Sequence, residues 1–271
     1  MPKKLEIVKR GRIYAVHYGE DTEVTMQLLV SLQPYLNPDR QLILINNDRP
    51  GLFGNWLVPY VTILDSGSNL GYFAGIKWAM ERYPVKGLDY VMVCNNDIVL
   101  QSPDFFRVLE DKLQVWDVVA PSTKTNDGVE QNPHRQCKPS LFRKIYYRFY
   151  FASYIFAWMA VKLIDWKNKK RAGRRMEPTE RAVFSPHGAC IVLKDSYFKN
   201  GGVIDGNCFL YAEEDSIAVL AAANRLKVGF VPELKVMHQE STTTGKSISR
   251  KKYGFQKEAY RYIKKTYPNI Y

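Results

Sequence analysis

The sequence predicts an α/β fold in which a mostly parallel sheet is flanked by helices. Strand-like apolar runs alternate with helix-spaced segments as far as Leu100, which indicates parallel βαβ units. Each apolar run ends in polar or small residues, and the carboxyl ends of parallel strands are where such sheets bind ligands. A chain of 271 residues, 46% of them hydrophobic, can bury a full core in one large domain or two small ones.

The first half of the chain supplies four strands and two helices. Runs rich in β-branched, aromatic and other apolar residues predict strands at Arg12–Tyr18, Gln41–Asp48, Val61–Gly71 and Tyr90–Asp97. Helical spacing predicts helices over 21–36 and 72–83. The first of these helices should end near Pro34, because proline cannot continue a helix.

The second half is less regular. Strands are expected over 115–123, 185–194 and 227–238, and helices over 195–199, 209–226 and 249–268. The helix that starts near Phe209 opens with acidic residues and becomes rich in alanine, whereas the last helix is basic and aromatic.

The stretch 141–175 combines aromatic, apolar and basic residues. Its apolar centre, Phe149–Val161, is too short to span a bilayer, which takes about 20 residues. Aromatic and basic side chains suit a membrane–water interface. We therefore expect helical structure lying on an anionic membrane surface; the alternative is an amphipathic helix packed on the core or at a dimer contact.

Composition narrows the partners and the compartment. The 39 Lys and Arg against 27 Asp and Glu give a net charge of +12, which fits an anionic partner such as nucleic acid, a phosphorylated substrate or a membrane. No nucleic-acid-binding motif is present, so a nucleic-acid partner is not expected. The chain begins without a secretory hydrophobic region, and no CxxC pair is present. We therefore expect the protein to be cytoplasmic and its four cysteines to be reduced: Cys94, Cys137, Cys190 and Cys208.

Asp97 is the first candidate for chemistry. It closes the polar triplet Asn95-Asn96-Asp97 at the end of the fourth predicted strand. A carboxylate there could bind Mg²⁺ or Mn²⁺, since Mg²⁺ commonly takes one or two carboxylates together with phosphate oxygens. The alternative is a loop stabilised by turns in which the Asn and Asp side chains bond the backbone.

A second candidate is the acidic run at Glu213, Glu214 and Asp215, directly before a predicted helix. Clustered carboxylates raise one another's proton affinity, which suits a general base. The same charges could serve only to favour the helix dipole. His238 follows a strand and precedes a polar segment, so it is either a metal ligand beside Asp97 or a structural histidine.

Taken in chain order, five segments resemble family 2 glycosyltransferases with the GT-A fold, of the rhamnosyltransferase-like kind that builds bacterial surface polysaccharides. The segments are "ILINND", "NLGYFAGIKWA", "VCNNDIVL", "GACIVLKDSYFKNGGVIDGNCFLYAEED" and "VMH". The resemblance covers roughly residues 10–125 and 183–240. It implies a catalytic domain over 1–240, with a nucleotide-binding half at 10–125, an acceptor half at 183–240 and a helical membrane-proximal insertion at 138–180. A basic helical segment, 241–271, follows.

The resemblance also implies roles for single residues. Glu214 would be the catalytic base, with Glu213 and Asp215 as rivals because the register of the acidic run is open. Asp97 and His238 would bind Mg²⁺ or Mn²⁺. Nucleotide-sugar contacts are implied for His17, Tyr18, Asn46, Asn47, Asn69, Gly71, Asn95 and Asn96.

The implied function is metal-dependent, inverting transfer of a sugar from a UDP- or dTDP-linked donor. The acceptor would be a hydroxyl of a polyprenyl-diphosphate-linked glycan, at the cytoplasmic face of the plasma membrane, and a homo-oligomer is compatible with the sequence. The chain departs from the family pattern at Asn46 and Ser216, where the family carries Asp, and its metal motif has one carboxylate. These departures leave open a non-catalytic nucleotide-sugar or membrane-binding protein of the same fold. A nucleotidyltransferase fits less well, because the segment after the first strand is acidic rather than basic.

Overall fold

The computed structural model describes residues 9–54, 56–170, 179–239 and 249–268, and for 164–170 only the backbone. The strands are β1 (Gly11–His17), β2 (Arg40–Asn46), β3 (Val61–Asp65), β4 (Tyr90–Asn95), β5 (Ile98–Leu100), β6 (Val118–Thr125), β7 (Arg181–Ala182), β8 (Cys190–Lys194) and β9 (Val228–His238). The helices are α1 (Glu23–Leu32), α2 (Tyr72–Arg82), α3 (Phe105–Lys112), α4 (Leu141–Tyr150), α5 (Tyr154–Lys170), α6 (Asp195–Lys199), α7 (Glu213–Ala223) and α8 (Arg250–Thr266), with a 3-10 turn at Gln33–Tyr35.

The strands form one sheet in the order β3-β2-β1-β4-β8-β6-β9-β5, and β7 pairs with β9. The strands of the first half, β3, β2, β1 and β4, run parallel, as the alternating pattern predicts. The second half is mixed: β8 lies antiparallel between β4 and β6, and β9 is parallel to β6 but antiparallel to β5. The carboxyl ends of β1, β2 and β4 therefore meet at one edge of the sheet, where ligands bind in such folds.

The core consists of two apolar layers, one on each face of the sheet. Successive strand residues point to opposite faces, so Ile13 and Ala15 pack with α1 and α3, while Tyr14 and Val16 pack with α2 and α7. Helices cover both faces, as a buried parallel sheet requires. The predicted α/β class with flanking helices is confirmed.

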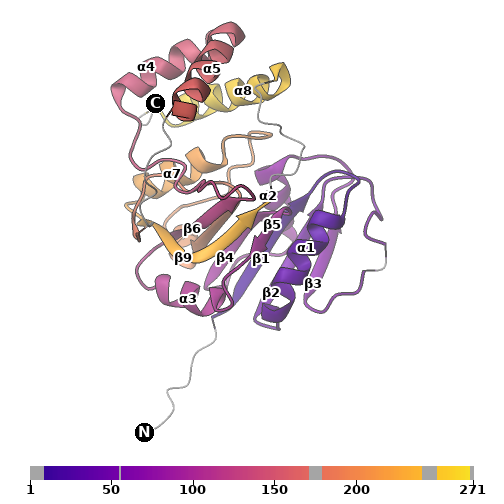
Figure 1. The fold of residues 1–271 in the computed structure, drawn as a ribbon. Coiled ribbons are helices and arrows are strands. Elements are labelled where there is room, and N and C mark those ends of the chain that lie inside the picture. The colour runs from indigo at the N-terminus through magenta and orange to yellow at the C-terminus, as the bar shows by residue number, and fades with distance from the viewer. Residues whose placement is uncertain (1–8, 55, 171–178, 240–248, 269–271) are drawn as a thin grey trace.

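A further helical layer, made of α4, α5 and α8, lies beyond α7 (Figure 1). The stretch that the sequence predicts to be helical turns out as two helices with a break after Tyr150, and its last residues, 171–175, fall outside the described part of the chain. Phe151 at the break stacks on Tyr260 of α8, with ring centroids 4.5 Å apart, and also packs on Tyr253. The inner side of the insertion is thus fixed to the C-terminal helix by aromatic contacts. Within the described residues, no helix is long and apolar enough to cross a bilayer.

Gly71 forms the turn between β3 and α2, and its backbone requires glycine for two reasons. Its φ of 87° lies in the left-handed region, and a Cβ at this position would lie 2.3 Å from the Phe209 carbonyl oxygen. Its carbonyl oxygen accepts a hydrogen bond of 2.8 Å from the Asn47 amide. The turn is therefore fixed from two sides, by β2 and by the 207–210 segment.

We expect Gly71→Ala to lower the free energy of unfolding by about 2 kcal/mol more than Gly67→Ala does. Gly67 has a similar φ of 76°, but a methyl group added there would meet nothing within 4 Å, so this position isolates the cost of the backbone conformation. Urea denaturation followed by circular dichroism measures both variants. Equal losses would show that the contact with Phe209 is not tight.

Candidate active site

Asp97 and His238 lie side by side at the carboxyl edge of the sheet. Asp97 sits in the turn that joins β4 to β5, and β5 pairs with β9 so that Ile98 lies opposite His238. The Asp97 carboxylate oxygen Oδ1 is 3.2 Å from His238 Nε2, and both side chains are buried. The triplet that interrupts the apolar run thus marks a sharp turn between two strands of the same sheet.

Gln131 orients the His238 ring. His238 Nδ1 donates to Gln131 Oε1 at 2.7 Å, so in the neutral imidazole Nε2 carries a lone pair. That lone pair faces the Asp97 carboxylate, and two acceptors 3.2 Å apart are the arrangement that a cation between or beside them would stabilise. An imidazole whose far nitrogen donates to an oxygen is typical of metal-ligating histidines. Among the described residues no three His, Cys, Asp or Glu side chains converge on one metal position.

The acidic run opens α7, and its three carboxylates have different surroundings. Glu213 is buried, whereas Glu214 is only partly so and accepts a hydrogen bond of 3.1 Å from the Gly188 N–H. Gly188 has no Cβ, and a Cβ there would lie 2.9 Å from Glu214 Oε1. Glu214 can therefore approach the start of β8 closely.

Asp215 is held by Arg135. The guanidinium contacts the carboxylate at 2.6 and 3.2 Å, and both side chains are largely buried. A two-point ion pair of this kind fixes the orientation of the carboxylate toward its partner. Of the three acids, Glu214 is the one whose environment leaves it available to a substrate.

The pKa values of Glu213 and Glu214 also differ. Burial, and next the charge of Glu214, raise the pKa of Glu213 to about 8. Burial alone would raise the pKa of Glu214 too, but His134, His187 and the Gly188 N–H outweigh it and lower that pKa. Near neutral pH, Glu213 is therefore protonated and Glu214 is ionised, which is the state a general base needs.

The segment 130–135, which follows β6, organises the site, although sequence reasoning gave it no role. Gln131 holds His238, Asn132 accepts from the backbone N–H of His187 at 2.7 Å, and Arg135 holds Asp215. The segment itself is fixed by Glu130, which accepts from the backbone N–H groups of Thr123 and Asn132. Its signal in the sequence was only a polar run after a strand.

His187 is a second residue to which sequence reasoning gave no role. Its Nδ1 accepts from the Ala189 N–H at 3.2 Å, and its ring lies edge-on to that of His238, with centroids 6.0 Å apart. Burial lowers its pKa to about 4, and it interacts electrostatically with both Glu214 and Asp97. A neutral imidazole therefore lies between the two candidate chemical groups.

His17 and Asn96, two of the predicted nucleotide-sugar contacts, are bonded to each other and to α1. His17 is fully buried, its Nε2 bonds the Gly19 carbonyl oxygen at 2.6 Å, and its Nδ1 lies 2.8 Å from Thr25 Oγ1. The Asn96 amide donates to the same threonine at 2.9 Å. Tyr18, the next residue, is 54% exposed and projects from the end of β1. Of this group, Tyr18 offers the open surface.

Asn46 and Asn47 differ in the hydrogen bonds that their side-chain oxygens make. The Asn46 amide donates to Asp65 Oδ1 at 2.6 Å and to the Arg49 carbonyl, and its oxygen accepts from the Asp48 N–H. Asn47 Oδ1 is buried and has no hydrogen-bond partner among the described residues. The exposed carboxylate of Asp65, at the end of β3, lies beside the position where the sequence lacked an acid.

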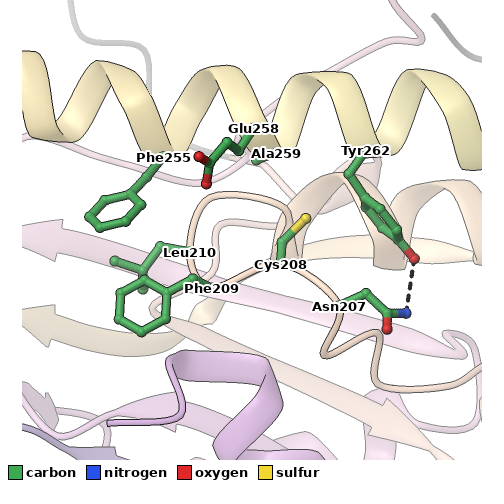
Figure 2. Close-up of a pocket in the computed structure, with 8 residues that line it drawn as sticks. All are labelled: Asn207, Cys208, Phe209, Leu210, Phe255, Glu258, Ala259 and Tyr262. Carbon is green, nitrogen blue, oxygen red and sulfur yellow. Dashed lines mark hydrogen bonds between the residues drawn. The ribbon is translucent and has the colours of Figure 1, made fainter.

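The remaining predicted contacts line the same edge. Asn69 accepts from the Gly71 N–H at 3.0 Å, which shapes the turn into α2, and the Asn95 amide donates to His238 Nε2 at 3.3 Å. A cavity of about 190 Å³ lies elsewhere, between α8 and the 207–210 segment (Figure 2). Neither Asp97 nor Glu214 lines that cavity, and Glu258 adds an acid to it, so it is not the predicted donor site.

The fold is of the GT-A type, as the resemblance implied. No family model matches the chain. Its relatives include N-acetylglucosaminyl-diphospho-decaprenol L-rhamnosyltransferase of Mycobacterium tuberculosis, 26% identical over 217 residues, which are 76% of this chain and 67% of that enzyme. The low-salt glycan biosynthesis hexosyltransferase of Haloferax volcanii is 22% identical over 180 residues, 65% of this chain and 51% of the relative.

Solved structures agree on the fold. GalNAc-T7 with UDP, GalNAc and Mn²⁺ gives a TM-score of 0.59 at 10% identity, covering 88% of this chain and 45% of its own. The mannosyltransferase PcManGT of Pyrobaculum calidifontis, in complex with GDP-Man and Mn²⁺, gives 0.55 at 12% identity, covering 94% and 70%. TarS of S. aureus gives 0.53 at 12% identity, covering 85% and 60%. The predicted resemblance to glycosyltransferases is confirmed, and the chain spans less than two thirds of several of these proteins.

Glu213→Gln should change how stability depends on pH. In the unfolded chain this carboxyl titrates near 4.5, and in the folded chain near 8, so between these values the folded state holds a proton that the unfolded state has lost. The wild type should therefore lose stability relative to the variant as pH rises from about 4.5 to 8, by roughly 1.4 kcal/mol per unit at most. Thermal denaturation at pH 5 and pH 8.5 measures this. A difference independent of pH would contradict the assignment.

Proposed function

We propose that this protein is an inverting glycosyltransferase that moves a hexosyl group from a UDP- or dTDP-linked donor to a hydroxyl of a lipid-linked glycan. The observation that carries the proposal is an ionised, partly exposed Glu214 near the Asp97–His238 pair. Residues 187 and 188 link the two groups: the His187 ring lies 6.0 Å from that of His238, and the Gly188 N–H donates to Glu214. Glycosyltransferase relatives and neighbours support the class of reaction.

In this mechanism Glu214 takes the proton from the acceptor hydroxyl as its oxygen attacks the anomeric carbon. The Gly188 N–H and the first turn of α7 hold the carboxylate in place and keep it ionised. Attack on one face, with the diphosphate leaving from the other, inverts the anomeric centre. Asp215, tied to Arg135, and Glu213, protonated, take no part in the proton transfer.

Asp97 and His238 would hold a divalent cation, Mg²⁺ or Mn²⁺, together with donor phosphate oxygens. When bound, such a cation neutralises the diphosphate and acts as a Lewis acid on the leaving group. Carboxylate oxygen and imidazole nitrogen both suit Mn²⁺, and two of the structural neighbours were crystallised with that ion. Gln131 fixes the imidazole tautomer that this role requires.

The nucleotide would lie along the ends of β1, β2 and β3. Tyr18 presents an exposed ring for the base, and the Asp65 carboxylate can accept from a base imide N–H in place of the acid that Asn46 lacks. Asn95, Asn69 and the Gly71 turn border the phosphates and sugar. His17, Asn46, Asn47 and Asn96 contribute by fixing these loops from below.

The acceptor would be a polyprenyl-diphosphate-linked glycan, so the chain would act at the inner face of the plasma membrane as a peripheral protein. The name of the mycobacterial relative specifies a diphospho-decaprenol acceptor, which supports this class. An excess of positive charge, +12 over the chain, favours approach to such an anionic surface.

Asp97→Ala and Glu214→Gln should both abolish most transfer, by about 100-fold or more, but for different reasons. Asp97→Ala removes a ligand of the donor complex and should weaken binding of the nucleotide sugar in the presence of Mn²⁺. Glu214→Gln keeps the shape and the Gly188 contact, so donor binding should persist while turnover stops. Calorimetric titration with UDP- and dTDP-sugars, combined with release of nucleoside diphosphate, measures both steps.

Asp215→Asn is the matched control for the acidic run. It breaks the ion pair with Arg135, so it should lower the melting temperature, yet a folded fraction should retain turnover far above that of Glu214→Gln. Near-normal turnover in Glu214→Gln would refute the base assignment. A wild type that binds donor but never releases nucleoside diphosphate would favour the non-catalytic binder of the same fold.

Gln131→Ala should weaken Mn²⁺ binding about 10- to 100-fold in the presence of nucleoside diphosphate, because His238 loses the acceptor that orients it. Electron paramagnetic resonance of free Mn²⁺ reports this directly, without any turnover. Gln136→Ala is the control, since Gln136 bonds the Ala182 carbonyl instead. Unchanged Mn²⁺ affinity in Gln131→Ala would contradict the role of Gln131 in orienting His238 for the metal.

A further inference from the structure

The helical layer carries a large apolar surface on its outer side. On α4, Phe142, Ile145, Tyr146 and Phe149 follow the spacing of one helix face, and all are exposed. In an ordinary surface helix this face would be turned toward the core. With its neighbours it forms what we call the outer face: Leu141, Phe142, Ile145, Tyr146, Phe149, Ile155, Phe156, Trp158, Met159 and Leu163.

The opposite side of the same helices is already occupied. Tyr147 and Tyr150 of α4 and Tyr154 of α5 lie against neighbouring aromatic rings: Tyr147 contacts Tyr260 of α8, and Tyr150 and Tyr154 contact Tyr253. Arg135, which holds Asp215, lies over the Tyr147 ring at 5.4 Å. The layer is thus docked on α8 and on Arg135, the ion-pair partner of Asp215 in α7, and its outer face is a second apolar surface. Contiguous surfaces of this kind mark interaction sites in proteins of known structure.

The charges beside the outer face have one sign. Residues 138–164 contain no Asp or Glu but five cations: Lys138, Arg143, Lys144, Arg148 and Lys162. Arg143, Arg148 and Lys162 are exposed among the apolar side chains. If two copies met through this face symmetrically, these cations would confront each other with no acid in the segment to offset them. Apolar and aromatic side chains with flanking cations instead match the boundary between acyl chains and anionic headgroups.

We propose that the outer face of α4 and α5 inserts into the headgroup–acyl boundary of an anionic bilayer. The proposed function includes only a general membrane association, and this proposal goes beyond it by naming the side chains that enter the lipid. Its link to a lipid-linked acceptor rests on the proposed function. The exposed apolar side chains follow one side of α4 and α5, so the helices would lie in the plane of the boundary with this side toward the acyl chains. The inner side of α4, through Tyr147 and Arg135, then brings the start of α7 and Glu214 close to the membrane surface.

Flotation of the full chain with phosphatidylcholine vesicles, with or without 30% phosphatidylglycerol, tests the surface. Phe142→Gln/Phe149→Gln should reduce partitioning into the anionic vesicles by about tenfold or more. The control Leu57→Gln/Val115→Gln removes two exposed apolar side chains elsewhere and should leave partitioning unchanged. Because all four residues are exposed, both variants should keep the wild-type circular dichroism spectrum.

A second pair of variants tests the cations. Arg148→Gln/Lys162→Gln should lower binding to anionic vesicles by roughly fivefold per charge and should leave the weak binding to neutral vesicles unchanged. Lys77→Gln/Lys86→Gln, two exposed cations elsewhere, is the matched control. Equal losses in both pairs would mean that the net charge, rather than this face, attracts the membrane.

Three outcomes overturn the proposal. The chain could fail to float with any vesicle, the Phe142→Gln/Phe149→Gln variant could float as well as the wild type, or light scattering could show a dimer that this variant dissociates. Activity separates this proposal from the proposed function. If the Phe142→Gln/Phe149→Gln variant no longer floats but keeps full transfer to a short-chain, water-soluble acceptor, both proposals are supported. If the wild type floats but transfers sugar to no acceptor, the enzymatic assignment is overturned and the membrane-binding surface is still supported.

Discussion

The structure must bring four carboxylates to one edge of a sheet without letting their mutual repulsion open the fold. Each is handled differently: Asp97 lies against His238, Asp215 is paired with Arg135, Glu213 is buried and holds its proton, and Glu214 keeps its charge beside an N–H donor. Within the acidic run, an ion pair holds Asp215 and a proton neutralises Glu213, which leaves Glu214 as the ionised acid beside an N–H donor. Under the proposed function, these different surroundings would make an acidic helix start, common in proteins for dipole reasons, a site for proton transfer.

The segment 130–135 connects these solutions. Its side chains reach His238, the His187 backbone and Asp215, and Glu130 anchors the segment to β6. His238, the candidate metal ligand, and the acidic run therefore share a single support.

Much of the site was predictable from the sequence because it lies at strand ends. Asn95-Asn96-Asp97 stands out in an apolar run, and the acidic run stands out before an alanine-rich helix. Gln131, Arg135 and His187 were not predictable, since their roles come from tertiary contacts between segments that carry no local pattern. The outward apolar face of α4 was equally hidden, because helical periodicity gives the stripe but not the direction in which it points. The burial of His17 was not predictable either, because its partners Thr25 and Asn96 come from other elements.

The 205–210 segment links the last helix to the first half of the chain. Asp205 accepts hydrogen bonds from Tyr262 of α8 and from Tyr267 just after it, Phe209 packs on Phe255, and the Phe209 carbonyl oxygen closes on the Gly71 turn. The turn that borders the donor is therefore completed by residues from the far end of the chain. During synthesis, the first four parallel strands can assemble early, yet this border takes its final form only once α8 has left the ribosome.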